Sequence, residues 1–243
     1  MLNMKSLRES LLDNDLVEKT DEMIIKDEIE TFLKENYRGS IKISEKPNKD
    51  DLYEVSSNSA VEVTNKNIIS LTNGMFIWTI VDGSFFCNNC KFLKSLEGAP
   101  KKVGGGFYCY SCIYLESLEG APEKVELSFS CNDCYSLTSL KGSPKEVGEG
   151  FYCSYCKSLT SLEGAPEKVG GTFYCSGCIS LKSLVGAPKK IGESFYCYKC
   201  KSLKSLEGAP KKVGKHFNCS GCAIKFTEED IRKISNVKGE IKN

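Results

Sequence analysis

The chain has 243 residues, with 33 Lys and Arg against 32 Asp and Glu, so its formal net charge is only +1. This balance excludes the global field with which a strongly basic protein attracts nucleic acid or a membrane surface. No apolar run of roughly 18 residues exists, which excludes a transmembrane helix. We also expect no signal peptide, because the first residues lack an apolar core.

Residues 1–59 are predicted to form an N-terminal lobe, or cap, that combines helix and strand. The stretch 21–36 has helical patterning, and Leu7–Val17 predicts an earlier, weaker helix. Three short strand-like runs follow, at residues 41–43, 52–55 and 61–63.

Residues 60–82 are predicted to form a degenerate first coil of a repeat. Ile68-Ile69-Ser70-Leu71 echoes the later Leu93-Lys94-Ser95-Leu96, which belongs to a complete repeat. The run Met75–Ile80 takes the place of a later Gly-Ala-Pro turn. It is expected to give the N-terminal cap additional apolar mass.

All fourteen cysteines stand in Cys-x-x-Cys pairs within seven units of 22 residues, which occupy residues 83–226. A fixed period of this length predicts a solenoid of stacked coils. Within each unit, Phe-x-Cys predicts a short strand with Phe and Cys facing the core, and Gly-Ala-Pro predicts a turn. The pairs are Cys87/Cys90, Cys109/Cys112, Cys131/Cys134, Cys153/Cys156, Cys175/Cys178, Cys197/Cys200 and Cys219/Cys222.

Residues 227–243 are predicted to form a C-terminal capping helix and a tail. Thr227 followed by Glu228-Glu229-Asp230 indicates an N-capped helix start. Residues 236–243 are expected to fray. Three apolar side chains are expected to cover the last coil: Phe226, Ile231 and Ile234.

The pattern Phe-x-Cys-x-x-Cys-x-x-Leu-x-x-Leu resembles the leucine-rich repeat, closest to its short bacterial type. Leu159-Thr160-Ser161-Leu162 followed by Pro166 matches that form, and the resemblance covers about residues 60–226. Similar repeats with a Cys or Asn ladder occur in proteins of bacteria and their phages. The resemblance implies that the second cysteine of each pair occupies a buried ladder.

The resemblance also implies the fold class. This is α+β: a leucine-rich-repeat solenoid with short parallel strands and a mostly non-helical convex side. A helix-containing cap at the N-terminus and a short capping helix at the C-terminus complete it, because the outermost coils of a solenoid otherwise expose their core.

The candidate binding surface is the exposed face of the strands. The residues on either side of the first cysteine alternate outward, and many of them are aromatic. Tyrosine suits an interface because it offers contact area with few rotors and a polar tip, although it also simply suits exposed strands. The predicted partner-binding residues are Phe86, Tyr108, Tyr110, Tyr152, Tyr174, Tyr196 and Tyr198.

Zinc is the first alternative use of the cysteines. The spacing Cys-x2-Cys-x18-Cys-x2-Cys falls within that of zinc ribbons. However, Leu115, Leu137 and Leu159 continue a packed pattern after each pair, and Phe-x-Cys turns the first thiol toward the core. We therefore expect free thiols that pack as small hydrophobes, with no metal and no cofactor.

Charged residues follow each proline, and opposite signs in neighbouring columns predict a solvated edge. These dipeptides are Lys101-Lys102, Glu123-Lys124, Lys145-Glu146, Glu167-Lys168, Lys189-Lys190 and Lys211-Lys212.

The sequence predicts a binding module, not an enzyme. Catalysis needs dissimilar groups that converge at one place, whereas near-identical repeats give rows of the same residue. We expect a monomer that binds a protein partner on its Tyr-rich face, and neither nucleic acid nor a membrane. A carbohydrate-binding surface or phage protein is the second alternative. Fourteen cysteines without a signal peptide indicate the reducing cytoplasm.

Overall fold

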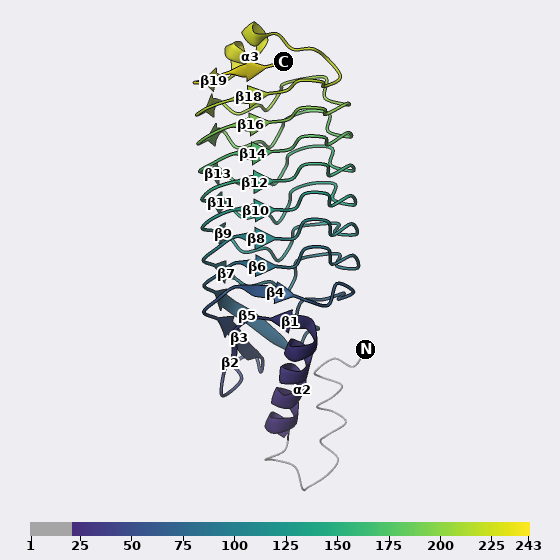
Figure 1. Cartoon of the computed structure of the whole chain (residues 1–243), viewed down its shortest axis with the longest axis vertical. Helices are drawn as coiled ribbons and strands as arrows, with labels where there is room; N and C mark the ends of the chain where they lie inside the picture. Colours follow the sequence, from purple (N-terminus) through teal and green to yellow (C-terminus); the bar gives the residue numbers. More distant parts are fainter. Residues whose placement is uncertain (1–20) are drawn as a thin grey trace.

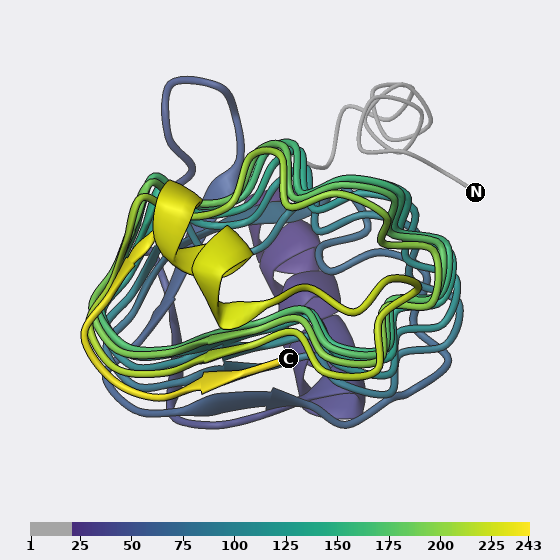
Figure 2. The same ribbon diagram turned by 90° about the horizontal axis from the view of Figure 1, so that it is seen from above.

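The computed structural model describes residues 21–243, which wind into a stack of coils with a helix at each end (Figure 1). Each coil contributes one short strand to each of two ten-stranded sheets. Seen along the stack, the coils superimpose into one outline (Figure 2), as expected from a strict period of 22 residues. The sequence prediction of a tandem-repeat solenoid is therefore confirmed. The helix predicted at Leu7–Val17 lies outside the described residues.

Sheet A contains the Phe-x-Cys strands, which pair in parallel from β4 to β20. Each repeat strand has only two residues, so the stability of the sheet comes from stacking many coils rather than from long strands. The strands of sheet A are β1 (Tyr37–Arg38), β4 (Val61–Val63), β6 (Phe85–Phe86), β8 (Phe107–Tyr108), β10 (Phe129–Ser130), β12 (Phe151–Tyr152), β14 (Phe173–Tyr174), β16 (Phe195–Tyr196), β18 (Phe217–Asn218) and β20 (Ile241–Lys242).

Sheet B lies on the side of the coil that follows the Gly-Ala-Pro turn. Its two-residue strands were not foreseen in the sequence, where only a non-helical second side was expected. The strands of sheet B are β2 (Ile41–Ile43), β3 (Tyr53–Ser57), β5 (Phe76–Val81), β7 (Lys102–Val103), β9 (Lys124–Val125), β11 (Glu146–Val147), β13 (Lys168–Val169), β15 (Lys190–Ile191), β17 (Lys212–Val213) and β19 (Asn236–Val237).

The core is built from columns of equivalent side chains, which confirms the predicted inward phase. The phenylalanines from Phe85 to Phe217 are buried and stack in one column, with successive ring centroids 5.1–5.7 Å apart. The two leucines of each of the first six repeats, such as Leu159 and Leu162, are also buried in the core. Burial of these columns supplies the main driving force for folding.

The cysteines form a second internal ladder. From Cys112 onward, the second thiol of each pair donates to the carbonyl oxygen of the first cysteine in the preceding coil, for example Cys156 to Cys131. All six such contacts measure 3.1–3.3 Å. Each carbonyl at the end of a strand is thereby satisfied inside the core. The predicted cysteine ladder is confirmed.

Each Cys-x-x-Cys segment turns the chain out of sheet A through a left-handed residue. The residue before the second cysteine has φ between 57° and 69° in all seven repeats, from Asn89 to Gly221. A second left-handed residue opens each Gly-Ala-Pro turn, and there glycine is required. A Cβ on Gly186 would lie 2.4 Å from backbone atoms of Leu162 in the coil below.

The N-terminal end is closed by helix α2 (Asp21–Asn36) and by antiparallel strands. Strand β1 pairs with β4 and β2 pairs with β3, both antiparallel, so the parallel stack stops there. The first full coil contains β4 and β5, which pair with β6 and β7 of the first repeat. Tyr37, Trp78 and Phe85 join this end to the phenylalanine column through ring contacts of 5.5 Å and 5.8 Å.

The C-terminal end is covered by helix α3 (Glu228–Ile234). Thr227 caps the helix in a capping box with Asp230, as predicted. Ile231 is buried, and Phe226 and Ile234 pack against the core. The expectation that residues 236–243 fray is wrong.

Those last residues form β19 and β20, which pair in parallel with β17 and β18. They complete one more coil without any cysteine. Val237 stands opposite Val213 and Ile241 opposite Phe217, so this coil keeps two apolar positions of the repeat.

Candidate functional site

The candidate site is the solvent side of sheet A. In a two-residue strand, one side chain faces the core and the next faces solvent. The phenylalanine of each strand is buried and its neighbour is half-buried, except for Ser130, which is buried. The solvent-facing column contains Phe86, Tyr108, Ser130, Tyr152, Tyr174, Tyr196 and Asn218.

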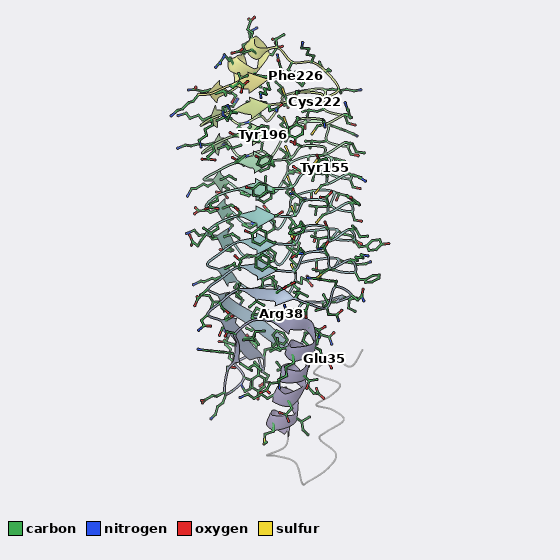
Figure 3. All side chains as sticks on the ribbon, in the orientation of Figure 1. Glu35, Arg38, Tyr155, Tyr196, Cys222 and Phe226 are labelled. Carbon is green, nitrogen blue, oxygen red and sulfur yellow. The ribbon has the colours of Figure 1, made fainter. Side chains whose placement is uncertain are left out.

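The aromatic residues of this column form two stacks, which Figure 3 shows as a row of rings along the strands. Phe86 and Tyr108 stack with centroids 4.9 Å apart. Tyr152, Tyr174 and Tyr196 form the longer stack, which we call the tyrosine triplet, with centroids 5.2 Å and 4.6 Å apart. Their planes are inclined by only 14° and 23°. Ser130 separates the two stacks.

Glycines two residues upstream make room for two of these rings. A Cβ on Gly106 would lie 2.5 Å from the hydroxyl of Tyr108, and one on Gly150 would lie 2.4 Å from the hydroxyl of Tyr152. These tyrosines therefore lie back along their own strands, over the glycine backbone. The Gly-Phe-Tyr sequence is a local signal for this conformation.

The second predicted column, directly after the first cysteine, lies in the turn and not in the strand. Tyr110 is 37% exposed there, and Tyr198 is half-buried. The equivalent Ser176 is fully buried. Of the seven predicted residues, the structure thus places five in sheet A, whereas Tyr110 and Tyr198 belong to the adjacent turn.

Tyr155, which the sequence prediction missed, lies in the equivalent turn of another coil. It occupies the left-handed position of its turn, with φ of 59°, and is 43% exposed (labelled in Figure 3). Its ring covers Gly177, where a Cβ would lie 2.5 Å from the ring. The Tyr198 phenol, two coils away, is close enough to raise the pKa of Tyr155. The glycine at position 177, in the next repeat, is the sequence feature that could have indicated this position of the Tyr155 ring.

The phenols of Tyr174 and Tyr155 have a raised pKa and are harder to ionise than free tyrosine. Burial is the main cause that raises the pKa of Tyr174, with smaller contributions from Tyr196 and Tyr152. The pKa of Tyr155 is raised mainly by the Tyr198 phenol. These hydroxyls stay neutral at physiological pH, so they can both donate and accept hydrogen bonds.

A separate group of exposed aromatic residues lies past the second cysteine of the first repeats. Phe92 and Tyr114 are each 50% exposed and stack at 6.3 Å. The Lys157 ammonium lies 4.1 Å from the ring centroid of Tyr135. This group is distinct from the tyrosine triplet, and the sequence prediction did not include it.

The cysteines do not assemble a metal site in the part of the chain that the structure describes. Within residues 21–243, no three Cys, His, Asp or Glu side chains converge so that they could hold an ion. All fourteen thiols are free, and only Cys222 is not fully buried. Burial raises the pKa of most of them, including Cys109 and Cys153. In the last Cys-x-x-Cys pair, hydrogen bonds from Cys197 and Cys200 lower the pKa of Cys222.

No described helix is long and apolar enough to cross a membrane.

The comparisons with known proteins add no relative. No family model, no curated protein and no solved structure matches the chain.

Proposed function

We propose that this protein is a non-enzymatic binding module whose tyrosine triplet, with Tyr155 and Tyr198 beside it, contacts a protein partner. The observation that carries the proposal is the half-exposed stack of Tyr152, Tyr174 and Tyr196 on a rigid sheet. Rigid aromatic side chains lose little conformational entropy on binding and are enriched at the centres of interfaces. The scaffold holds these rings in place before the partner arrives.

Ring orientation favours a protein over a carbohydrate as the partner. Sugars bind tyrosine by placing an apolar face on an open ring face. Inside the tyrosine triplet, Tyr174 is covered on both ring faces by its neighbours, at 5.2 Å and 4.6 Å, and Tyr152 and Tyr196 are each covered on one face. The surface therefore offers ring edges and neutral hydroxyls, which suit backbone carbonyls and apolar side chains of a protein.

The test replaces Tyr152, Tyr174 and Tyr196 together by Ser and measures the affinity for a partner isolated with the wild-type protein. Loss of aromatic anchors costs about 2 kcal/mol or more each at an interface centre, so binding should fall by at least tenfold. The matched control replaces Tyr114 and Tyr135 by Ser, because these tyrosines are exposed but lie outside sheet A. Circular dichroism should show that both variants are folded. Unchanged affinity of the triple variant would redirect attention to the N-terminal lobe.

The proposed family is the leucine-rich repeat of the short bacterial or phage type. Its support is the pattern of two buried leucine columns beside a cysteine ladder that bonds to the preceding coil. The proposed compartment is the cytoplasm, since fourteen free thiols persist only under reducing conditions.

The absence of catalysis is also proposed, and the position of the sole histidine supports it. His216 accepts a hydrogen bond at Nδ1 from the backbone amide of Glu240, 3.2 Å away. This contact ties the histidine to the last coil. A hydrogen bond to the backbone of the last coil indicates a structural role for this histidine.

A further inference from the structure

The near-neutral charge of the chain conceals a strongly basic end of the stack. Residues 179–226 contain ten lysines, and their only acidic residues are Glu193 and Glu207, so their formal charge is +8. All ten lysines are exposed. Within residues 21–243, only Lys215 among them lies within salt-bridge distance of a carboxylate, that of Glu193. The preceding residues 113–178 contain nine acidic and five basic residues.

The positive charge is densest at the start of two adjacent strands of sheet B, in a group that we call the lysine quartet. It consists of Lys189, Lys190, Lys211 and Lys212. Lys190 and Lys212 are direct partners in the sheet, and the backbone amide of Lys211 donates to the carbonyl of Lys189. Adjacent coils lie about 4.8 Å apart. Like charges directly opposite one another in a sheet are destabilising.

Two middle pairs of coils offset this repulsion with opposite charges in the same columns, although Lys102 and Lys124 also stand in adjacent coils. There, Lys145 pairs with Glu123 and Lys168 pairs with Glu146, each across adjacent coils. The structure describes no carboxylate within salt-bridge distance of the lysine quartet anywhere in residues 21–243. The predicted edge is exposed at these two coils as well, but its charges there are of one sign.

An apolar groove runs beside the lysine quartet. It has a volume of about 650 Å³ and crosses three successive Gly-Ala-Pro turns. Alanines and prolines line it, among them Ala165 and Pro188. Its charged lining residues are Lys168, Lys189, Lys211 and one carboxylate, Glu167. It continues into a second hollow of about 510 Å³ against helix α3, where Phe226 adds apolar surface.

We propose that this groove binds an extended acidic peptide segment of a partner protein, with its apolar side chains on the Ala-Pro lining and its carboxylates on the lysine quartet. Charge complementarity identifies the partner as an anion. The four neighbouring ammonium groups form no salt bridge within residues 21–243, and they outnumber the single carboxylate of the groove, that of Glu167. The apolar lining favours a peptide over nucleic acid, because a peptide has apolar side chains to bury there, whereas phosphate contacts would use the lysines alone. This site is separate from the tyrosine triplet of sheet A.

Fluorescence anisotropy tests the proposal with a labelled ten-residue peptide of alternating glutamate and leucine, added to the full chain. We expect binding at low salt that weakens as salt rises. A glutamine–leucine peptide removes the charge, and a glutamate–serine peptide removes the apolar side chains. Each should bind at least tenfold more weakly than the glutamate–leucine peptide.

Two charge-reversal variants locate the site. Lys190→Glu combined with Lys211→Glu recreates the alternating signs of the middle coils, so the fold should be retained while peptide affinity falls at least tenfold. Lys101→Glu combined with Lys102→Glu changes the charge equally in the same columns, outside the groove. This control and the variant with Tyr152, Tyr174 and Tyr196 replaced by Ser should bind the peptide as wild type does.

Three results would overturn the proposal. One is no binding of the glutamate–leucine peptide up to about 1 mM. Another is equal loss of binding in both charge-reversal variants, which would indicate only a diffuse charge effect. The third is tighter binding of a labelled oligodeoxythymidylate than of the peptide, which would assign the basic surface to nucleic acid.

Discussion

Single side chains in this protein have equivalents in every coil, so a position can be judged by its column. Leu162 belongs to a buried leucine column and has no exposed surface itself. Its neighbour Glu163 is exposed. Adjacent residues therefore differ completely in their contribution to stability. The difference follows from the direction in which each side chain points.

Leu162→Ala should lower the free energy of unfolding by roughly 2–5 kcal/mol, because it leaves a cavity in a close-packed column. Glu163→Ala should change it by no more than about 0.5 kcal/mol, because the carboxylate is surrounded by water. Urea denaturation followed by circular dichroism measures both values. Equal, small effects would mean that the column does not hold the stack together.

At the scale of the turns, the left-handed glycines differ in how tightly they are enclosed. Gly186 has φ of 93°, and a Cβ there would lie 2.4 Å from the backbone of the coil below. Gly221 has φ of 67°, but a Cβ there would meet nothing closer than 3.7 Å. The two positions separate backbone strain from steric overlap.

Gly186→Ala should destabilise the protein by about 3 kcal/mol or more, because strain and overlap add. Gly221→Ala should cost only about 1 kcal/mol, the penalty of a left-handed residue with a side chain. Thermal unfolding of the two variants gives the comparison. Similar melting temperatures would show that the coils separate easily enough to admit a methyl group.

The elements differ in how well the sequence predicted them. The Phe-x-Cys strands and both terminal helices follow from periodicity and capping, because their side chains carry the pattern. The repeat strands of sheet B, such as β13 (Lys168–Val169), have only two residues each. Two residues are too few for an alternation of apolar and polar side chains to be detected. The final strands β19 and β20 lack the Phe-x-Cys pattern. Only Val237 and Ile241 continue the apolar columns, opposite Val213 and Phe217 of the coil below.

The candidate site was predicted in part for a related reason. Alternation along the strand identified Tyr152, Tyr174 and Tyr196 as solvent-facing. Tyr155 was missed because its direction depends on a left-handed backbone and on the absence of a side chain at Gly177. A rule for strands carries no information about either feature.

For the whole molecule, the sulfur content tests whether the stack folds without metal. Incubation with EDTA should leave the melting temperature unchanged, and denatured protein should titrate all fourteen thiols. The reason is that the second thiols bond to backbone carbonyls of neighbouring coils instead of to an ion. Zinc at roughly three atoms per chain or more, with a lower melting temperature in EDTA, would contradict this.

The succession of near-identical coils also determines how the molecule would respond to being pulled from its C-terminus. Each coil is bonded to its neighbours along the axis and closes on itself through no covalent link. Under tension, coils would peel away one at a time from the end that carries β20. Every event would release one period of 22 residues. This segment corresponds to roughly 75 Å of extended chain. The extension of the molecule would therefore increase in steps of equal length.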